Sequence, residues 1–141
     1  MRRYLVVANQ TLGGEHLMSK VRECMAAGPS RFHIVVPASQ PPEHMTHTEG
    51  QARALAGRRL EVALERFRAI GADVQGEVGD GNPVEAISDT MRLHAFDEVI
   101  LSTLPPGVSR WIHQDLPHRV ERLFDLPVIH VIADKEAAAA T

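Results

Sequence analysis

Short apolar runs rich in valine and isoleucine recur along the chain, separated by longer segments with helical spacing. The runs lie at 4–8, 32–36, 74–78, 98–102 and 128–132. All but the third are nearly continuous, which is typical of strands that are buried on both faces. The run at 74–78 alternates and contains Gly76, as expected of an edge strand. A chain patterned in this way is predicted to fold into an α/β domain.

The segments between these runs carry apolar residues three or four positions apart, the spacing of an amphipathic helix. The clearest helix is predicted over 49–70, begun by a capping box of Thr46 with Glu49 and closed by Gly71. Its buried stripe is expected to consist of Ala52, Ala56, Leu60, Ala63, Phe67 and Ile70. Its charged side is predicted to be a solvated face, formed by Arg53, Arg58, Arg59, Glu61, Glu65 and Arg68.

Three further helices are predicted, at 15–27, from Pro83 onward, and at 116–124. The second has a strong start signal, because Asn82 is a favoured N-cap and Pro83 suits the first helical position. Strands and helices then alternate, and the crossovers are long enough for parallel pairing. We predict one doubly wound, mostly parallel five-stranded α/β domain over 1–134, with helices on both faces and a flexible tail at 135–141.

Composition excludes several classes of function. The net charge is −3 and the isoelectric point is near 6.2, so nothing indicates nucleic acid or an anionic membrane as partner. The single cysteine, Cys24, cannot form an intrachain disulfide, and no apolar run approaches the roughly 18 residues of a membrane span. We expect a cytoplasmic protein.

Four segments, in order, resemble the universal stress protein family: "YLVVANQT", "VGDGNPVEAI", "FDEVILST" and "HRVERLFDLPVIHVIA". The resemblance covers nearly the whole chain, and it implies the strand order 3-2-1-4-5. It also implies a homodimer that pairs through the last strand, at 127–133, where "PVIHVIA" would be an uncharged edge. Family members usually carry an aspartate where Asn9 stands, so the expected adenine contact is weakened here.

ATP-binding members of that family carry G-x2-G-x9-G-[ST] before the last helix, where this chain has "STLPPGVSRWIHQDL". Ser102 and Pro105 stand at the first two glycines, and Gln114 and Asp115 stand at the final glycine and hydroxyl. We expect Asp115 to cap the last helix with its own carboxylate and so to repel a phosphate. Prolines at 105, 106 and 117 lack the N–H groups that a phosphate would use.

Ligands of doubly wound sheets bind beyond the carboxyl ends of the strands, where the winding reverses. Together with the resemblance, this rule gives the predicted pocket: Asn9, Val36, Leu101, Ser102, Gly107, Ser109, Arg110, Gln114 and Asp115. The leading hypothesis is a ligand-sensing or partner-binding module with a degenerate nucleotide pocket and no catalysis. No cofactor is assigned; ATP, AMP or another adenine nucleotide stays open. The alternatives are a true ATP or AMP binder using Arg110 and Gln114, and an enzyme acting on a phosphate ester.

Other candidate sites have plainer interpretations. Gly13 and Gly14 precede a helix without a Walker lysine, so they predict a tight turn rather than a phosphate loop. His44 and His47 lie in a proline-rich segment and predict a solvated loop rather than a zinc site. The remaining candidates are expected to be structural, with packed or paired side chains: Cys24, His33, Trp111 and His130.

Overall fold

The computed structural model describes residues 1–38 and 49–133, and within these ranges strands and helices alternate along the chain. The strands are β1 (Arg2–Val7), β2 (Ser30–Pro37), β3 (Asp73–Gly79), β4 (Glu98–Thr103) and β5 (Val128–Ile132). The helices are α1 (Glu15–Ala27), α2 (Glu49–Ala69), α3 (Pro83–Leu93), α4 (Arg110–His113) and α5 (Leu116–Phe124). No helix in these ranges is both long and apolar enough to cross a membrane.

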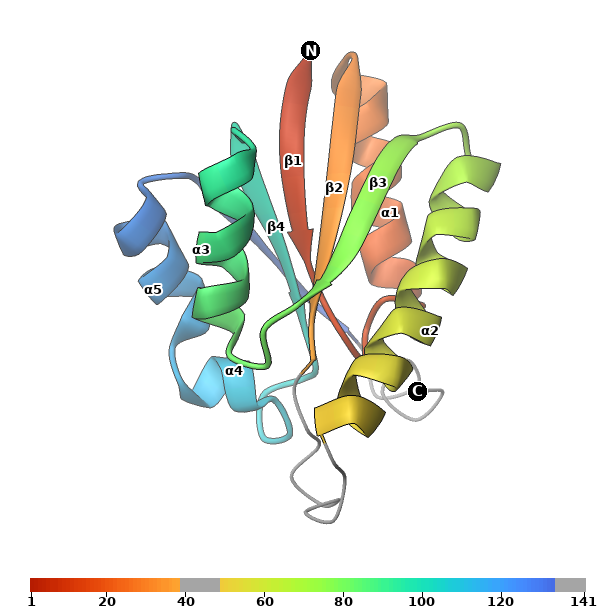
Figure 1. Ribbon diagram of the computed structural model, residues 1–141. Helices are drawn as coiled ribbons and strands as arrows, with labels where there is room; N and C mark the ends of the chain where they lie inside the picture. The colour runs from red at the N-terminus through yellow and green to blue at the C-terminus, as the bar shows by residue number, and fades with distance from the viewer. Residues whose placement is uncertain (39–48, 134–141) are drawn as a thin grey trace.

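The strands form one sheet in the order β3-β2-β1-β4-β5, and all neighbouring pairs are parallel (Figure 1). Both the predicted order and the predicted strands are confirmed. The chain winds outward from β1 through β2 to the edge strand β3, then returns past β1 to β4. The winding therefore reverses between β1 and β4, whose pairing runs from Tyr4–Glu98 to Val7–Leu101.

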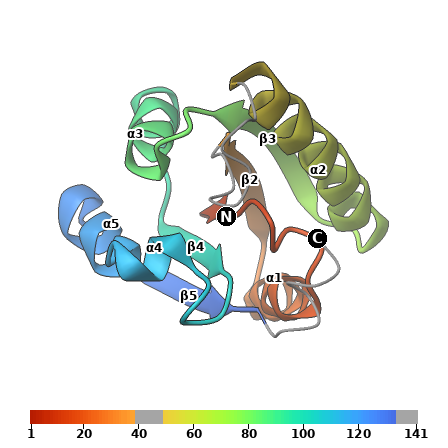
Figure 2. The same cartoon turned by 90° about the horizontal axis from the view of Figure 1, so that it is seen from below.

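Helices α1 and α2 cover one face of the sheet, and α3 and α5 cover the other (Figure 2). On the α1–α2 side the ring of Phe32 stacks on Tyr4, with centroids 5.2 Å apart, and meets Phe67 edge-on at 6.0 Å. Each such side chain contributes about 1.5–3 kcal/mol when it is fully buried. Five of the six predicted stripe residues of α2 are buried: Ala52, Ala56, Leu60, Ala63 and Phe67.

Two helix ends form as the sequence predicts. The side-chain oxygen of Asn82 accepts hydrogen bonds from the amides of Val84 and Glu85 at 3.0 and 3.4 Å, and Pro83 occupies the first turn of α3. Such a cap is worth about 1 kcal/mol. Gly71 follows α2 with a φ of +86°, a conformation that favours glycine, and its amide donates to the last helical turn at 2.9 Å.

The glycines of β3 allow two helices to approach the edge of the sheet. A Cβ at Gly79 would lie 2.8 Å from the Cβ of Ala86 on α3 and 3.0 Å from Val35 on β2. A Cβ at Gly76 would lie 2.7 Å from Leu60 on α2. Neither position has room for a side chain, so the edge strand is covered by helices on both faces.

The structure adds one element to the prediction, the single-turn helix α4. The hydroxyl of Ser109 starts it by accepting a hydrogen bond from the amide of Ile112 at 3.2 Å. One turn has too few residues for a helical period to be visible in the sequence. Two other predictions involve residues outside the described ranges: the capping box, which needs Thr46, and the tail at 135–141.

Candidate functional site

The point where the winding reverses is bordered by two connections, the β1–α1 turn and the segment from β4 to α5. They leave the sheet toward opposite faces, so the carboxyl ends of β1 and β4 lie between them (Figures 1 and 2). This is where doubly wound proteins bind ligands. We call the region the switch point, defined by residues 8–14 and 102–115.

The β1–α1 turn is closed by its own backbone. The amide of Leu12 donates to the carbonyl of Asn9 at 3.3 Å, and the amide of Gly14 donates to Thr11 at 3.0 Å. The carbonyl of Gly13 in turn accepts a hydrogen bond from Arg66 of α2 at 2.6 Å. The prediction of a tight turn is confirmed, because amides bonded within the turn are unavailable to a phosphate.

A buried hydrogen bond joins the two connections across the switch point. The hydroxyls of Thr11 and Ser102 lie 2.6 Å apart, and the two residues are 2% and 1% exposed. Ser102 is thus bonded to protein rather than presented to a ligand. Thr11 has no signal in the sequence beyond its position just after a strand end.

Asn9 is half-buried at the end of β1, and both ends of its side-chain amide are bonded to protein. Its Nδ2 donates to the carbonyl of Pro37 at the end of β2, at 2.7 Å. Its Oδ1 accepts a hydrogen bond from Nη1 of Arg59 on α2, at 2.6 Å. Asn9 therefore holds three elements together, and it brings a positively charged group to the switch point.

The prediction that the charged side of α2 is a solvated face is wrong for Arg59. Its side chain is half-buried, whereas Arg58 beside it is exposed. Burial lowers the pKa of the Arg59 guanidinium, and the positive charge of Arg58 lowers it further. The spacing contained a signal, since Arg59 follows Ala56 by three positions and precedes Ala63 by four and so borders the buried stripe.

The segment after β4 forms a compact turn rather than an open glycine loop. The carbonyl of Pro105 accepts hydrogen bonds from the amides of Val108 and Ser109, at 3.2 and 3.1 Å. Gly107 lies within this turn with a φ of +95°, where a side chain would be strained. Ser109 is only 3% exposed, because its hydroxyl caps α4.

The predicted capping role of Asp115 is wrong. Asp115 does precede α5, but its φ is +54° and its carboxylate makes no hydrogen bond to the amides of the helix. The carboxylate instead lies 2.8 Å from Nδ1 of His118. In the left-handed conformation an N-cap side chain is turned away from the first-turn amides. The negative charge still stands beside the amino end of α5.

Backbone amides through this segment are bonded internally. His113, Gln114 and Asp115 donate to the carbonyls of Ser109, Arg110 and Ile112 at 3.3, 3.0 and 3.0 Å. With the two amides bonded to Pro105 and the one bonded to Ser109, six donors are already satisfied within the segment. The prolines at 105, 106 and 117 have no N–H to offer.

The remaining predicted pocket residues divide between core and surface. Val36 and Leu101 are fully buried, in the α1–α2 core and the α3–α5 core respectively, so their side chains have no surface for a ligand. Of the predicted residues in the segment after β4, three are exposed besides Asp115: Gly107, Arg110 and Gln114. The structure thus brings the predicted residues to one end of the sheet without turning all of their side chains toward it.

Two histidines of the sheet, His33 and His130, are bonded within the protein, as predicted. The Nε2 of buried His33 lies 3.0 Å from a carboxylate oxygen of Glu77. The Nε2 of His130 on β5 lies 2.8 Å from the hydroxyl of Thr103. Burial lowers the pKa of His130, and the charge of His118 adds to that effect.

The predicted positions of Cys24 and Trp111 are also confirmed. Cys24 is 7% exposed, and Trp111 packs against the core beneath α5. No three His, Cys, Asp or Glu residues are grouped as a metal site within 1–38 and 49–133. His44 and His47 lie outside these ranges.

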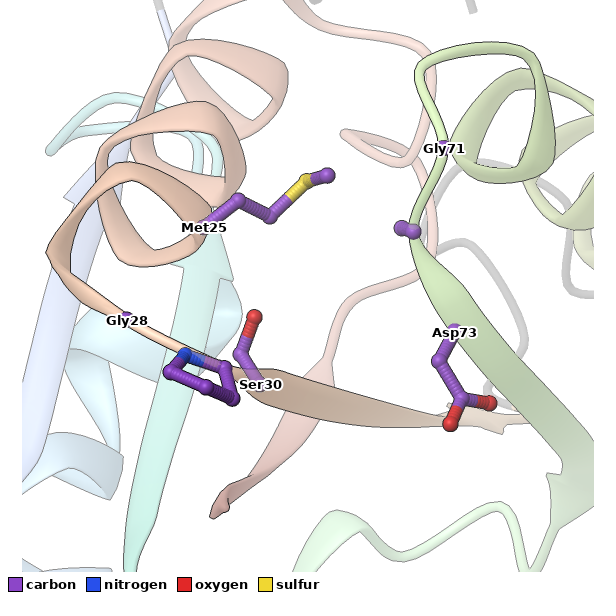
Figure 3. Close-up of a pocket in the computed structure, with 7 residues that line it drawn as sticks. Met25, Gly28, Ser30, Gly71 and Asp73 are labelled. Carbon is purple, nitrogen blue, oxygen red and sulfur yellow. The ribbon is translucent and has the colours of Figure 1, made fainter.

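A shallow pocket of about 270 Å³ lies at the opposite, amino-terminal end of the sheet (Figure 3). Its labelled lining residues come from the end of α1, the turns that precede β2 and β3, and the first residues of these strands: Met25, Gly28, Ser30, Gly71 and Asp73. The carboxylate of Asp73 is paired with Arg31 at 3.0 Å. The pocket therefore offers a ligand little beyond one serine and a carboxylate that is already paired.

The geometry defines a doubly wound α/β protein, and in such sheets the switch point is the usual place for a ligand site. No family model and no curated protein matches this chain. Among solved structures, a universal stress protein family protein from Arabidopsis thaliana with AMP bound superposes with a TM-score of 0.67 and 10% identity, covering 96% of this chain and 94% of the other. A universal stress protein from Archaeoglobus fulgidus gives 0.58 at 16% identity, with 93% of each chain covered.

The chain has the universal stress protein fold. The fold predicted from the four resembling segments is therefore confirmed, and the low identities fit a divergent sequence. Structural similarity at 10–16% sequence identity establishes the fold alone, so the function must be argued from the residues at the switch point.

Proposed function

We propose that this protein is a cytoplasmic, non-catalytic homodimer that senses a ligand or binds a partner, with a degenerate form of the nucleotide pocket. The observation that carries this proposal is the segment after β4. Six of its amides are bonded internally, two of its positions are prolines, and a third proline, Pro117, lies in the first turn of α5. A triphosphate needs several unpaired amides directed at it, whereas these amides of the segment are already hydrogen-bonded within its own turns.

Charge at the amino end of α5 supports the same conclusion. Asp115 is exposed and carries no cap bond, so its carboxylate stands near any phosphate that approached α5. A like charge at about 5 Å costs on the order of 1 kcal/mol in partly solvated surroundings. Arg110 is exposed on the same segment, and its positive charge offsets part of that repulsion.

A second candidate function is a true adenine nucleotide sensor. The observation that favours it is the similarly folded Arabidopsis protein, which was solved with AMP bound. A monophosphate needs fewer amide donors than a triphosphate, and Arg110 with Gln114 could supply part of the difference. Under this alternative, AMP would bind more tightly than ATP.

The dimer is proposed to form through β5. This strand pairs only with β4 in the described sheet, contains no charged residue, and leaves Ile132 42% exposed. An uncharged edge of this kind is a template for pairing with another strand. Two copies joined there would form one continuous sheet.

Isothermal titration with ATP, AMP and cyclic AMP tests the proposal. We expect ATP to bind no more tightly than about 10 μM, which corresponds to roughly −7 kcal/mol. Asp115→Asn should strengthen ATP binding about fivefold, because it removes one like charge. Asp125→Asn is the matched control: Asp125 also has a positive φ, +52°, but lies at the far end of α5.

ATP binding by the natural sequence that is tighter than about 10 μM would contradict the degenerate pocket. An equal gain from Asp115→Asn and Asp125→Asn would show that net charge, rather than the amino end of α5, governs affinity. Nucleotide turnover that disappears on changing a switch-point residue would contradict the absence of catalysis and favour an enzyme acting on a phosphate ester.

A further inference from the structure

His130 lies at the middle of β5, the edge strand through which the dimer is proposed to form. Val128 and Ile129 precede it in the strand, and Val131 and Ile132 follow it. The strand pairs with β4 on one side, and its other side is an edge of the described sheet. A second copy that paired antiparallel on this edge would be related to the first by a two-fold axis between the two strands.

The backbone bonds to β4 show which groups of β5 face the edge. The carbonyl of Pro127 and the amide of Ala133 both bond to β4, at 3.0 and 2.9 Å. Because peptide groups alternate in direction along a strand, the odd-numbered residues of β5 bond toward β4. The N–H and C=O groups of Val128, His130 and Ile132 therefore point to the edge.

This alternation limits the register of an antiparallel partner, because edge-facing residues must pair with edge-facing residues. When the pairing is centred on His130, all of them are used: Val128 lies opposite Ile132 of the second copy, and His130 lies opposite His130. A shift in either direction leaves one edge-facing residue without a partner. Each pair exchanges two backbone hydrogen bonds, so the centred register forms the most bonds. It places two His130 side chains directly opposite each other on one face of the joined sheet.

The side chain of His130 lies on the α4–α5 side of the sheet, because its neighbour Ile129 packs into the α1–α2 core and side chains alternate. Its Nε2 lies 2.8 Å from the hydroxyl of Thr103, a group with no formal charge. From α5 it is faced by His118, whose Nδ1 lies 2.8 Å from the carboxylate of Asp115. The other ionisable side chains of α4 and α5 are mostly positive: Arg110, His113, Arg119, Glu121 and Arg122.

We propose that His130 pairs with its own copy across the two-fold axis, and that the dimer forms with both rings neutral and dissociates when they are protonated. Opposed residues of an antiparallel pair have Cβ atoms about 4.5–5.5 Å apart, and like charges at that separation are destabilising. The inference rests on the proposed function in taking β5 as the dimer edge. It adds the register of the pairing and the condition under which the second copy is released.

The pH dependence has a definite sign. Burial lowers the pKa of His130 in the single chain, and the charge of His118 adds to that effect, so the neutral ring that the dimer needs is the main form at neutral pH. A second positive charge opposite the ring would lower the pKa of His130 further, so protons bind more tightly to the separate chains than to the dimer. The dimer is therefore fully formed above the pKa of His130 in the separate chain and is lost as the pH falls below it.

Analytical ultracentrifugation of the natural sequence between about pH 8 and pH 5 tests the inference. We expect the Kd of the dimer to be constant near the upper end and to rise at least about fivefold at the lower end, because two protons are taken up per dimer. His130→Gln keeps a polar side chain without the charge, so its Kd should change by less than about twofold. His94→Gln, at an exposed histidine outside β5, is the matched control and should keep the pH dependence. Circular dichroism at each pH establishes that the protein is folded.

A cross-link tests the register without a change of pH. Opposed Cα atoms of a hydrogen-bonded antiparallel pair lie about 5.5 Å apart, within the range that a disulfide spans. His130→Cys should therefore form a disulfide between copies under mild oxidation, whereas Ile129→Cys, which this register places opposite Val131, should not. The natural Cys24 is 7% exposed on α1 and should stay unlinked in both variants.

A dimer whose Kd is the same at about pH 8 and pH 5 would overturn the inference and leave the proposed dimer intact. Equal pH dependence in His130→Gln and the natural sequence would also overturn it, as would cross-linking of Ile129→Cys as readily as His130→Cys. Failure of the proposed function has a different signature. A natural sequence that is monomeric at about pH 8 and about 100 μM, with no cross-link in either variant, would refute the dimer and the inference together.

Discussion

We predict that the buried hydrogen bond between Thr11 and Ser102 stabilises the two connections of the switch point, and its contribution to the free energy of unfolding can be measured. Ser102→Ala removes one partner of a 2.6 Å contact between hydroxyls that are 2% and 1% exposed. The substitution leaves the oxygen of Thr11 buried with no partner at Ser102, at a cost of about 1–3 kcal/mol. Thr11→Val keeps the shape of the side chain and should cost a similar amount.

The double variant separates this explanation from simple loss of packing. Removing both hydroxyls leaves no unpaired polar group, so the two costs should not add. We expect a coupling free energy of about 1–2 kcal/mol between the two positions. For a chain of this size, each kcal/mol shifts the melting temperature by roughly 2–8 °C.

The natural sequence, the two single variants and the double variant are compared by urea denaturation, and equal m-values show that their free energies of unfolding can be compared directly. Ser19→Ala, on the exposed side of α1, is the control. The control should change the free energy of unfolding by less than about 0.5 kcal/mol. Additive losses in the double variant would refute the reasoning, as would a Ser102→Ala variant as stable as the control. Either result would mean that the two connections are held by packing alone.

Three further predictions follow from the same contacts. Gly79→Ala should destabilise the fold by about 1–3 kcal/mol, because the new Cβ would lie 2.8 Å from the Cβ of Ala86. Gly57→Ala, where a Cβ on α2 meets no other atom, should stabilise the fold by about 0.5–1 kcal/mol. Thermal unfolding measures both effects. Ile132→Lys on the exposed edge strand should convert a dimer to a monomer in light scattering, whereas Val62→Lys, 54% exposed on α2, should not. Because the pKa of His130 is lowered in the folded state, stability should fall as the pH drops below about 6.5, where the unfolded chain binds the proton first. His130→Gln should show a smaller loss between pH 7.5 and 5.5 in urea unfolding, and an equal loss would contradict this assignment.

The order and type of the elements could be predicted because they depend on local patterns. Apolar runs of β-branched residues specified buried strands, and stripes three or four residues apart specified α1 and α2. Asn82, a favoured N-cap, and Pro83, which suits the first turn of a helix, predicted the start of α3. The single turn of α4 was missed, because four residues contain no period and its capping residue, Ser109, is a common surface residue.

The candidate site was predicted less completely, and two of its residues show why. Asp115 has the residue type of an N-cap, yet its positive φ turns the carboxylate toward His118. Arg59 has the spacing of a border position, yet its partner Asn9 lies 50 positions away in the chain. Neither a backbone dihedral nor a partner at that separation is encoded in a short window of sequence.

The sequence alone determined the layered α/β architecture and which polar residues lie at the carboxyl end of the sheet. It did so through residue periodicity, and because the carboxyl ends of parallel strands lie at one edge. Only the tertiary structure decided which polar groups at that edge are already satisfied. That outcome depends on distances of about 3 Å between residues far apart in the chain: Thr11 with Ser102, and Asn9 with Arg59. Such pairings exist only once the elements have packed.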